Sequence, residues 1–151
     1  MKSIICTMYL RRGVVYIRSV SSVHRGPYQD DGPCGRIPDP ENFEKLGAAA
    51  VHFAGESRED IENKSIQSLN EATRVWLDAA GVSSWSTFVR LAKNISFRIR
   101  DEIEIMPYHN GGLKGSGRGY TEIQDRAIHL PLNASHDKIG RAIMESFERC
   151  T

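Results

Sequence analysis

Residues 95–107 read ISFRIRDEIEIMP, and this run decides the fold class. Apolar residues alternate with polar or charged ones on both sides of Arg100-Asp101-Glu102, which is the period of a half-buried strand. The interruption predicts a tight reversal, because one strand of eleven residues would exceed the usual length. The run therefore predicts two antiparallel strands, and Pro107 ends the second because proline cannot donate to a ladder.

Further strands and loops follow on either side of this run. Residues 4–10 and 14–17 are rich in strand formers and flank a short Arg-Arg-Gly segment, which predicts a β-hairpin. Another strand is expected around residues 127–130. Residues 25–40 contain seven glycines and prolines, which exclude a helix and argue against a central strand. We expect a long loop there that crosses the surface.

Apolar residues at helical spacing predict helices at 43–55 and about 65–80, a short helix after Ser84, and a last helix from 138 to about 149. Gly81 fits a C-terminal cap of the second helix, and Ser84 fits an N-terminal cap of the third. Together the elements predict an α+β fold: a single domain over residues 1–151, with a mostly antiparallel sheet packed by three or four helices.

The first and last predicted helices begin alike, with EKLGAA at residues 44–49 and DKIGRA at residues 137–142. A glycine inside a helix costs about 1 kcal/mol relative to alanine. Its use in both helices indicates that they press closely on a sheet or on each other. The alternative is a chance similarity between two amphipathic helix starts.

The composition is that of a folded chain, with 151 residues of which 40% are hydrophobic and 26% charged. A net charge of +1 lacks the basic excess of a protein that binds nucleic acid mainly through phosphates. No stretch approaches the roughly 20 apolar residues of a membrane-spanning helix, and the start does not read as a signal peptide. We therefore expect a cytoplasmic protein with no membrane contact.

The residues of metal and redox sites are present but not suitably spaced. Cys6, Cys34 and Cys150 are odd in number and far apart, which favours reduced thiols over a disulfide framework. The five histidines show no metal-ligand spacing. We expect no metal and no cofactor.

The glycine-rich residues 110–119, NGGLKGSGRG, are the strongest local hint of chemistry, because glycine backbone beside Lys114 can cradle a phosphate. The segment lacks a Gly-Lys-Ser/Thr ending and leads into a strand, so a mobile connecting loop is the favoured interpretation. Ser116 lacks the context of a nucleophile elbow, and no histidine has a partner by spacing. We expect no catalytic residue. The rival hypothesis is a small enzyme, or an RNA- or phosphate-binding protein, that uses this loop with His109 and Arg118.

Charge is unevenly distributed along the chain. Residues 1–38 hold six basic and two acidic groups (+4), residues 39–62 two basic and seven acidic (−5), and residues 63–151 twelve basic and ten acidic (+2). The acidic block could meet a basic partner. The alternative is a solvated helix face whose carboxylates favour helix N-termini.

A set of short motifs in fixed order resembles the immunity proteins of bacterial contact-dependent growth inhibition (CDI) systems over roughly residues 40–150. The motifs are Glu44-Lys45-Leu46-Gly47 followed by Ala50 and Ser57, then Phe88, the Phe97-to-Ile105 strand pair ending in Pro107, and Ile139-Gly140-Arg141-Ala142 with Cys150. The resemblance implies a protein that binds and blocks the toxic C-terminal domain of a large secreted exoprotein, commonly a nuclease. It implies no direct contact with nucleic acid.

Binding residues in such proteins vary with the cognate toxin, so the resemblance transfers none, and we nominate candidates from this sequence. Carboxylates come first because they complement a basic nuclease face, and aromatic residues follow because interfaces depend on a few buried anchors. The candidates are Glu56, Glu59, Asp60 and Glu62, then Glu102 and Glu104, then Lys114 and Arg118, with Tyr108 and Tyr120 flanking the loop. The net charge of +1 leaves exosite binding open beside active-site occlusion.

Overall fold

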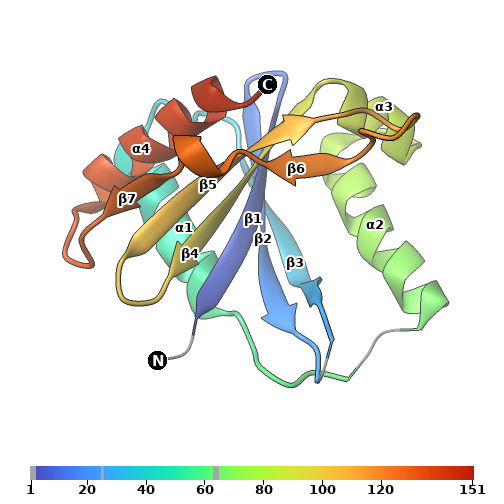
Figure 1. The fold of residues 1–151 in the computed structure, drawn as a ribbon, viewed down its shortest axis with the longest axis horizontal. Coiled ribbons are helices and arrows are strands. Elements are labelled where there is room, and N and C mark those ends of the chain that lie inside the picture. The colour runs from blue at the N-terminus through green and yellow to red at the C-terminus, as the bar shows by residue number, and fades with distance from the viewer. Residues whose placement is uncertain (1–2, 25, 63–64) are drawn as a thin grey trace.

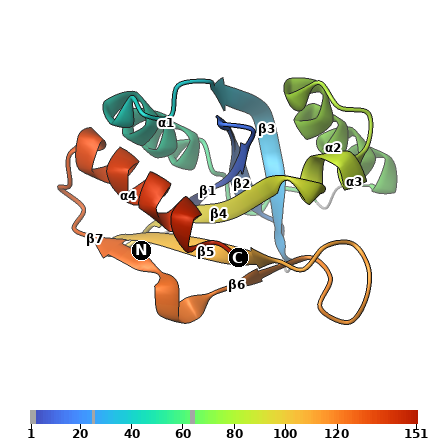
Figure 2. The ribbon, with the colours of Figure 1, turned by 90° about the horizontal axis from the view of Figure 1, so that it is seen from above.

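A seven-stranded antiparallel sheet organises the described part of this computed structural model, residues 3–24, 26–62 and 65–151. In chain order its elements are β1 (Ile4–Arg11), β2 (Val14–Ser22), β3 (Tyr28–Ile37), α1 (Phe43–Gly55), α2 (Ile66–Ala80), α3 (Trp85–Arg90), β4 (Ala92–Ile99), β5 (Ile103–Asn110), β6 (Tyr120–Glu122), a 3-10 turn (Gln124–Arg126), β7 (Ile128–Leu130) and α4 (His136–Arg149). The strand order is β3-β2-β1-β4-β5, with β6 and β7 both paired to β5. Helices α1 and α4 lie on one face and α2 and α3 on the other (Figures 1 and 2). This arrangement confirms the predicted α+β fold class.

The predicted N-terminal hairpin is confirmed as β1 and β2. Arg12 and Gly13 connect the strands with φ angles of 50° and 78°. This left-handed pair is what a two-residue type I′ turn requires, and it matches the twist of the flanking strands. The strands pair from Arg11 opposite Val14 down to Ile5 opposite Val20. Helices cover both faces here, so β2 is buried along nearly its whole length rather than on alternate residues.

Strand β3 lies within the region expected to be a surface loop, so that prediction is wrong for residues 28–37. The strand pairs only with β2 at the sheet edge, where breaker residues are tolerated. Its register shifts opposite Arg18 and Ser19, leaving Gly32 and Pro33 outside the ladder as a bulge. The Arg18 side chain fills this irregularity, because its Nε donates to the Gly32 carbonyl at 2.7 Å.

Helices α1 and α4 cross each other at their glycines. A Cβ atom built on Gly47 would lie 1.9 Å from the carbonyl oxygen of His136, and one on Gly140 would lie 1.9 Å from that of Phe43. The prediction of close approach is confirmed, and the contact is between the two helices themselves. Beneath the crossing lies the larger core, which includes Leu46, Ala50, Ile139, Ile143 and Phe147 from the helices and Met8, Ile17, Phe97 and Ile105 from the sheet.

The opposite face carries an aromatic cluster around Tyr9. The Tyr9 ring meets Trp76 of α2 edge-on with centroids 4.9 Å apart, and it meets Phe88 of α3 at 5.2 Å. The predicted caps are confirmed: Gly81 ends α2 with φ 68°, and Ser84 accepts from the Thr87 amide at the start of α3. Edge-to-face aromatic pairs contribute stabilisation beyond that of the apolar area they bury. This cluster therefore holds α2 and α3 on the sheet.

Strands β4 and β5 form the predicted reversal, with Ile99 opposite Ile103. Pro107 does not end β5, which continues to Asn110, so that part of the prediction is wrong. The Pro107 carbonyl accepts from the Ile123 amide on the outer side of β5. In an antiparallel strand the backbone nitrogen and oxygen of one residue point to the same side. The Pro107 nitrogen, which carries no hydrogen, therefore faces the break between β6 and β7, and no hydrogen bond to β4 is lost. The strand expected around 127–130 is confirmed as β7, and β6 was not foreseen.

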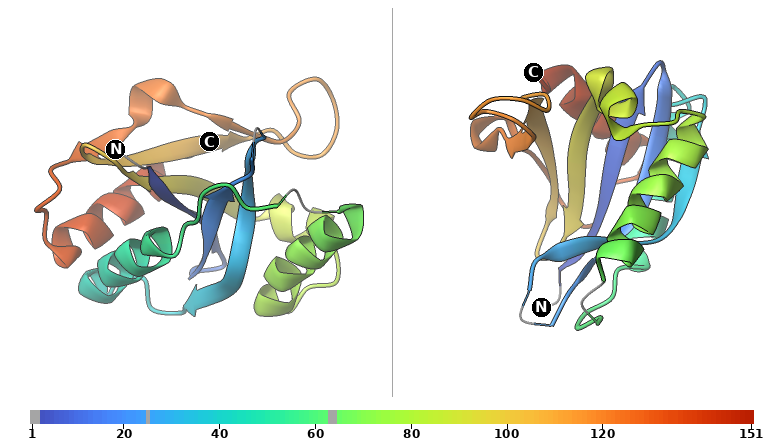
Figure 3. Two further views of the ribbon diagram at one scale, coloured as in Figure 1. Left: turned by 90° about the horizontal axis from the view of Figure 1, so that it is seen from below. Right: turned by 90° about the vertical axis from the view of Figure 1, so that its right-hand side faces the viewer.

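The register of β1 and β4 defines two ends of the sheet. Ile4 pairs with Ile99, and Arg11 pairs with Ala92 about 25 Å away along the strands. The first end holds the β4–β5 turn and the end of β2, and we call it the turn end. The second holds the β1–β2 turn and residues 110–119, and we call it the loop end (Figures 1 and 3).

Candidate functional site

Residues 56–62 follow α1 at the turn end and form what we call the acidic segment. The Ser22 amide at the end of β2 donates to the Arg58 carbonyl at 2.9 Å, and the Ile61 amide donates back to Ser22 at 3.0 Å. The Arg58 guanidinium donates two hydrogen bonds to the Asp31 carboxylate of β3, from Nε at 2.8 Å and from Nη2 at 2.9 Å. These hydrogen bonds raise the pKa of Arg58 above its ordinary value. The segment is thus tied to two strands.

The carboxylates of the acidic segment all face solvent. Glu56, Glu59, Asp60 and Glu62 are exposed. Asp60 pairs with His24 at 3.5 Å, and the other three form no ion pair with the described residues. Four acidic side chains therefore stand together on an anchored piece of backbone.

The −5 block of the sequence does not form one surface. Its other carboxylates, Asp39, Glu41 and Glu44, lie at the start of α1, while the acidic segment follows its end. Glu56 follows Glu44 by twelve positions along the helix, a distance of about 18 Å along its axis. Only the second half of the block remains a candidate surface.

The second group of candidates, Glu102 and Glu104, also lies at the turn end. An Oε1 of Glu102 is 2.7 Å from Nδ1 of His129, and Glu104 is 3.8 Å from Arg98. Strand β1 lies between β2 and β4. The acidic segment is hydrogen-bonded to the end of β2, and β4 leads into the turn that holds Glu102. The fold brings the two groups to one end of the sheet, but Glu102 already contacts His129 and Glu104 already pairs with Arg98.

The two candidate tyrosines are used inside the fold. Tyr108 donates its hydroxyl to Glu122 at 3.2 Å, and burial raises the pKa of this phenol. Tyr120 donates to the Ala92 carbonyl at 2.8 Å, and its ring lies 5.7 Å from that of Tyr9. Burial likewise raises the pKa of Tyr120. Tyr120 therefore belongs to the aromatic cluster rather than to an open surface.

The glycine-rich residues 110–119 form a loop closed at its base. The Gly111 amide donates to Gly119 and the Gly119 amide donates to Gly112, both at 2.8 Å. A Cβ on Gly111 would lie 1.6 Å from the Gly117 carbonyl oxygen, so only glycine fits this crossing. The prediction of a loop between two strands is confirmed, and its base is fixed by backbone hydrogen bonds.

Asn110 joins this loop to the end of α3. Its Nδ2 donates to the carbonyls of Val89 and Ala92 at 2.8 and 3.2 Å. Its Oδ1 accepts from the Gly112 amide at 3.0 Å. One side chain thus connects the helix, the sheet and the loop.

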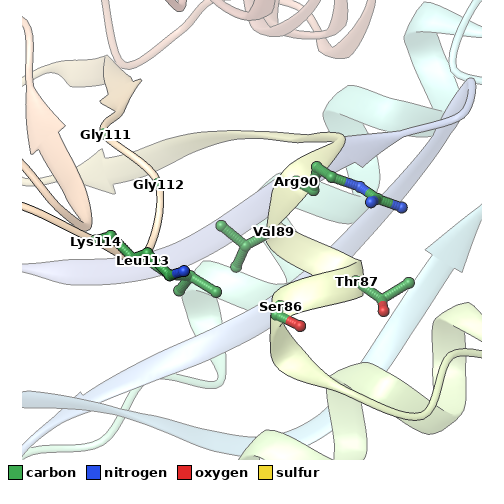
Figure 4. A pocket seen from close by; sticks show the side chains of 8 residues that line it. All are labelled: Ser86, Thr87, Val89, Arg90, Gly111, Gly112, Leu113 and Lys114. Carbon is green, nitrogen blue, oxygen red and sulfur yellow. The ribbon is translucent and has the colours of Figure 1, made fainter.

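Between α3 and the loop lies a cavity of about 500 Å³, which we call the α3–loop groove (Figure 4). Ser86, Thr87, Val89 and Arg90 line one side and residues 111–114 the other. Leu113 is 47% exposed at this groove. Sequence reasoning nominated Lys114 but missed Leu113 and α3. The available signal was a single apolar residue in a stretch otherwise made of glycine and polar side chains.

The rival hypothesis placed His109 and Arg118 at this loop. His109 Nδ1 lies 2.6 Å from the Thr151 hydroxyl, and neither His109 nor Arg118 lines the groove.

Among the described residues, no three His, Cys, Asp or Glu side chains gather where they could hold a metal ion. The cysteines are free, and burial raises the pKa of the Cys34 thiol to about 11. In the described part of the chain, no helix has the length and apolar character needed to cross a membrane.

Comparison with known proteins gives a family match and several solved chains of similar fold, two of which are described here. A family model described as CDI immunity protein matches residues 5–150. A search of the curated proteins finds no match. A protein of unknown function from Neisseria meningitidis is 15% identical with a TM-score of 0.83, covering 99% of this chain and 96% of that one. The CdiA-CT/CdiI toxin and immunity complex from Yersinia pseudotuberculosis matches with 15% identity and a TM-score of 0.81, covering 100% of this chain and 99% of that one. At this identity the likeness concerns the fold alone.

Proposed function

Since this chain belongs to the family of CDI immunity proteins, we propose that it binds the toxin domain of its cognate CDI effector in the cytoplasm and neutralises it, and that this toxin is a nuclease. The match over residues 5–150 carries the first part of the proposal. In this account the protein acts by stoichiometric binding. It has no catalytic residue or cofactor and contacts neither nucleic acid nor membrane.

The acidic segment supports a nuclease as the target. A nuclease needs a basic face to hold phosphates, and fixed carboxylates on a partner complement that face. Glu56, Glu59 and Glu62 are exposed and form no ion pair with the described residues, so their charges are available to a partner. The Arg58–Asp31 contact holds this segment on the sheet, which lowers the entropy lost when it binds.

The charge pattern favours contact through one acidic edge. The whole chain has a net charge of +1, and the −5 block is divided between the two ends of α1. A surface that copied a nucleic-acid backbone would need many carboxylates over a wide area. Four carboxylates on one segment are suited to covering part of a basic face, either at the active site or at a neighbouring exosite.

The direct test uses the toxin domain encoded immediately upstream of this gene. The purified toxin is assayed for cleavage of DNA and RNA, and its binding to this protein is measured by calorimetry. We expect nuclease activity and a complex with a dissociation constant well below one micromolar. A toxin without nuclease activity contradicts the choice of target, and absence of a complex at micromolar concentrations contradicts the immunity function.

Charge reversal tests the acidic segment separately. Glu59→Lys combined with Asp60→Lys should lower the association rate constant by about tenfold at low salt and reduce its salt dependence, because both depend on long-range attraction. Glu148→Lys combined with Asp125→Lys is the control with the same change of charge, since both residues are exposed and form no ion pair with the described residues. An unchanged association rate in the double variant removes the acidic segment from the interface.

A further inference from the structure

We propose that the α3–loop groove receives an apolar side chain of the toxin, and that a neighbouring toxin carboxylate meets Lys114. The partner is the toxin of the proposed function, so the inference rests on that function. It adds a second binding surface, at the opposite end of the sheet from the acidic segment.

The groove is formed before any partner binds. Asn110 fixes the end of α3 and the start of the loop with three hydrogen bonds, and two backbone bonds close the loop at Gly111 and Gly119. The volume of about 500 Å³ falls in the range of about 300–1,000 Å³ that is usual for sites holding a small ligand or a few side chains. A preformed cavity of this kind binds with less loss of conformational entropy.

The residues around the groove define what fits it. Val89 is buried on the α3 side, and Leu113 presents a half-exposed side chain from the loop. Figure 4 shows Lys114 beside Leu113, while the Arg90 side chain extends away from the loop. Lys114 is exposed and forms no ion pair with the described residues. An apolar group with an adjacent carboxylate complements both properties.

The two surfaces should act on different rate constants. Exposed charges such as the acidic segment mainly steer association, whereas a desolvated apolar anchor mainly slows dissociation. About 25 Å of strand separates the ends of the sheet that carry them. Substitutions at one surface can therefore be read independently of the other.

The test is kinetic binding of Leu113→Asp and Lys114→Glu variants to the cognate toxin domain. We expect Leu113→Asp to raise the dissociation constant on the order of 10- to 100-fold through faster dissociation. Lys114→Glu should weaken binding less, and Leu113→Met should retain it. Leu132→Asp is the matched control, because Leu132 is 52% exposed in the connection from β7 to α4, away from the groove.

The outcomes separate the inference from the function on which it rests. If the wild-type protein binds and inhibits the toxin but Leu113→Asp behaves like Leu132→Asp, the groove is not the anchor and the immunity function stands. If the wild-type protein forms no complex, both fall. A second readout is nuclear magnetic resonance of the folded protein with added toxin. The amide signals of Gly111 and Gly112 should shift or broaden strongly, and unchanged signals contradict the proposal.

Discussion

Replacing Gly47 with alanine should force helices α1 and α4 apart and destabilise the protein. The added methyl group would lie 1.9 Å from the backbone oxygen of His136, where ordinary van der Waals contact begins near 3.4 Å. The obstacle is helical backbone, so no side chain can rotate out of the way. The two helices would have to separate by about 1.5 Å, and a close-packed interior cannot absorb such a shift locally.

The expected cost follows from two opposing terms. Forcing an extra methyl group into a packed interface costs about 1–3 kcal/mol, and overlap with backbone lies at the upper end. Alanine returns about 1 kcal/mol because it favours helix more than glycine does. Separation of α1 and α4 also loosens the contacts of Leu46 and Ile139, both fully buried below the crossing. We expect the free energy of unfolding to fall by about 2 kcal/mol or more.

Urea denaturation followed by circular dichroism measures this change, and a loss of about 2 kcal/mol should lower the midpoint by roughly 1 M. Gly55→Ala is the control, because Gly55 ends the same helix and a Cβ there would meet nothing within 4 Å. Gly140→Ala should resemble Gly47→Ala, and the double variant should cost less than both together because the first substitution opens the gap for the second. Equal stability of Gly47→Ala and Gly55→Ala would refute the reasoning.

Three further substitutions or conditions test local features. Asn110→Ala removes the hydrogen bonds to Val89 and Gly112 and should lower the free energy of unfolding by about 1–3 kcal/mol. The same denaturation assay measures this change, and an unchanged free energy would show that the two bonds do not stabilise the fold. Arg58→Ala removes the two guanidinium bonds to Asp31 and should speed amide hydrogen exchange across the acidic segment while α4 keeps its protection. Unchanged exchange in the acidic segment would contradict the anchoring role. Burial raises the pKa of the Cys34 thiol from 9.0 to about 11, so the stability linked to this thiol is fully present below pH 9.0 and is lost as the pH rises through about 11. At pH 8, Cys34 should alkylate with iodoacetamide more slowly than free cysteine, and equally fast reaction would contradict this burial.

The elements that could be predicted are those with their own local signals. Each helix combines an apolar stripe with a cap, as α2 does with Ser65 and Gly81. The β1–β2 hairpin is rich in strand formers on both sides of a short turn, and the β4–β5 reversal carries period-two alternation. The glycines of α1 and α4 indicated close packing before the partner helix was known. The resemblance carried by short ordered motifs is confirmed by the family match over residues 5–150.

The errors concern residues whose effect depends on where the fold places them. Gly32 and Pro33 are tolerated in β3 because the strand lies at the sheet edge and bulges there. Pro107 is tolerated inside β5 because its nitrogen faces a break between two other strands. Neither circumstance is visible locally. The division of the acidic block by α1 followed already from the predicted helix at 43–55, but the charge count treated the block as one surface.

The α3–loop groove was beyond local prediction for a related reason. Helix α3 and residues 110–119 are separated by two whole strands, and they meet because Asn110 reaches back to the carbonyl of Val89. A half-exposed leucine becomes informative only once its neighbours are known. The acidic segment could be nominated from the sequence, because the number of charged residues in each stretch can be counted directly. The contact of Arg58 with Asp31 that anchors this segment could not be predicted, because it depends on the fold.

The most direct test of the account is a titration of the cognate toxin's nuclease activity with this protein. Fixed toxin is mixed with increasing amounts of the immunity protein, and cleavage of a fluorescent nucleic acid is followed. We predict that activity falls linearly to zero at one equivalent, as expected for tight stoichiometric binding, and that Leu113→Asp requires a large excess. Full cleavage in the presence of excess wild-type protein would contradict the central claim.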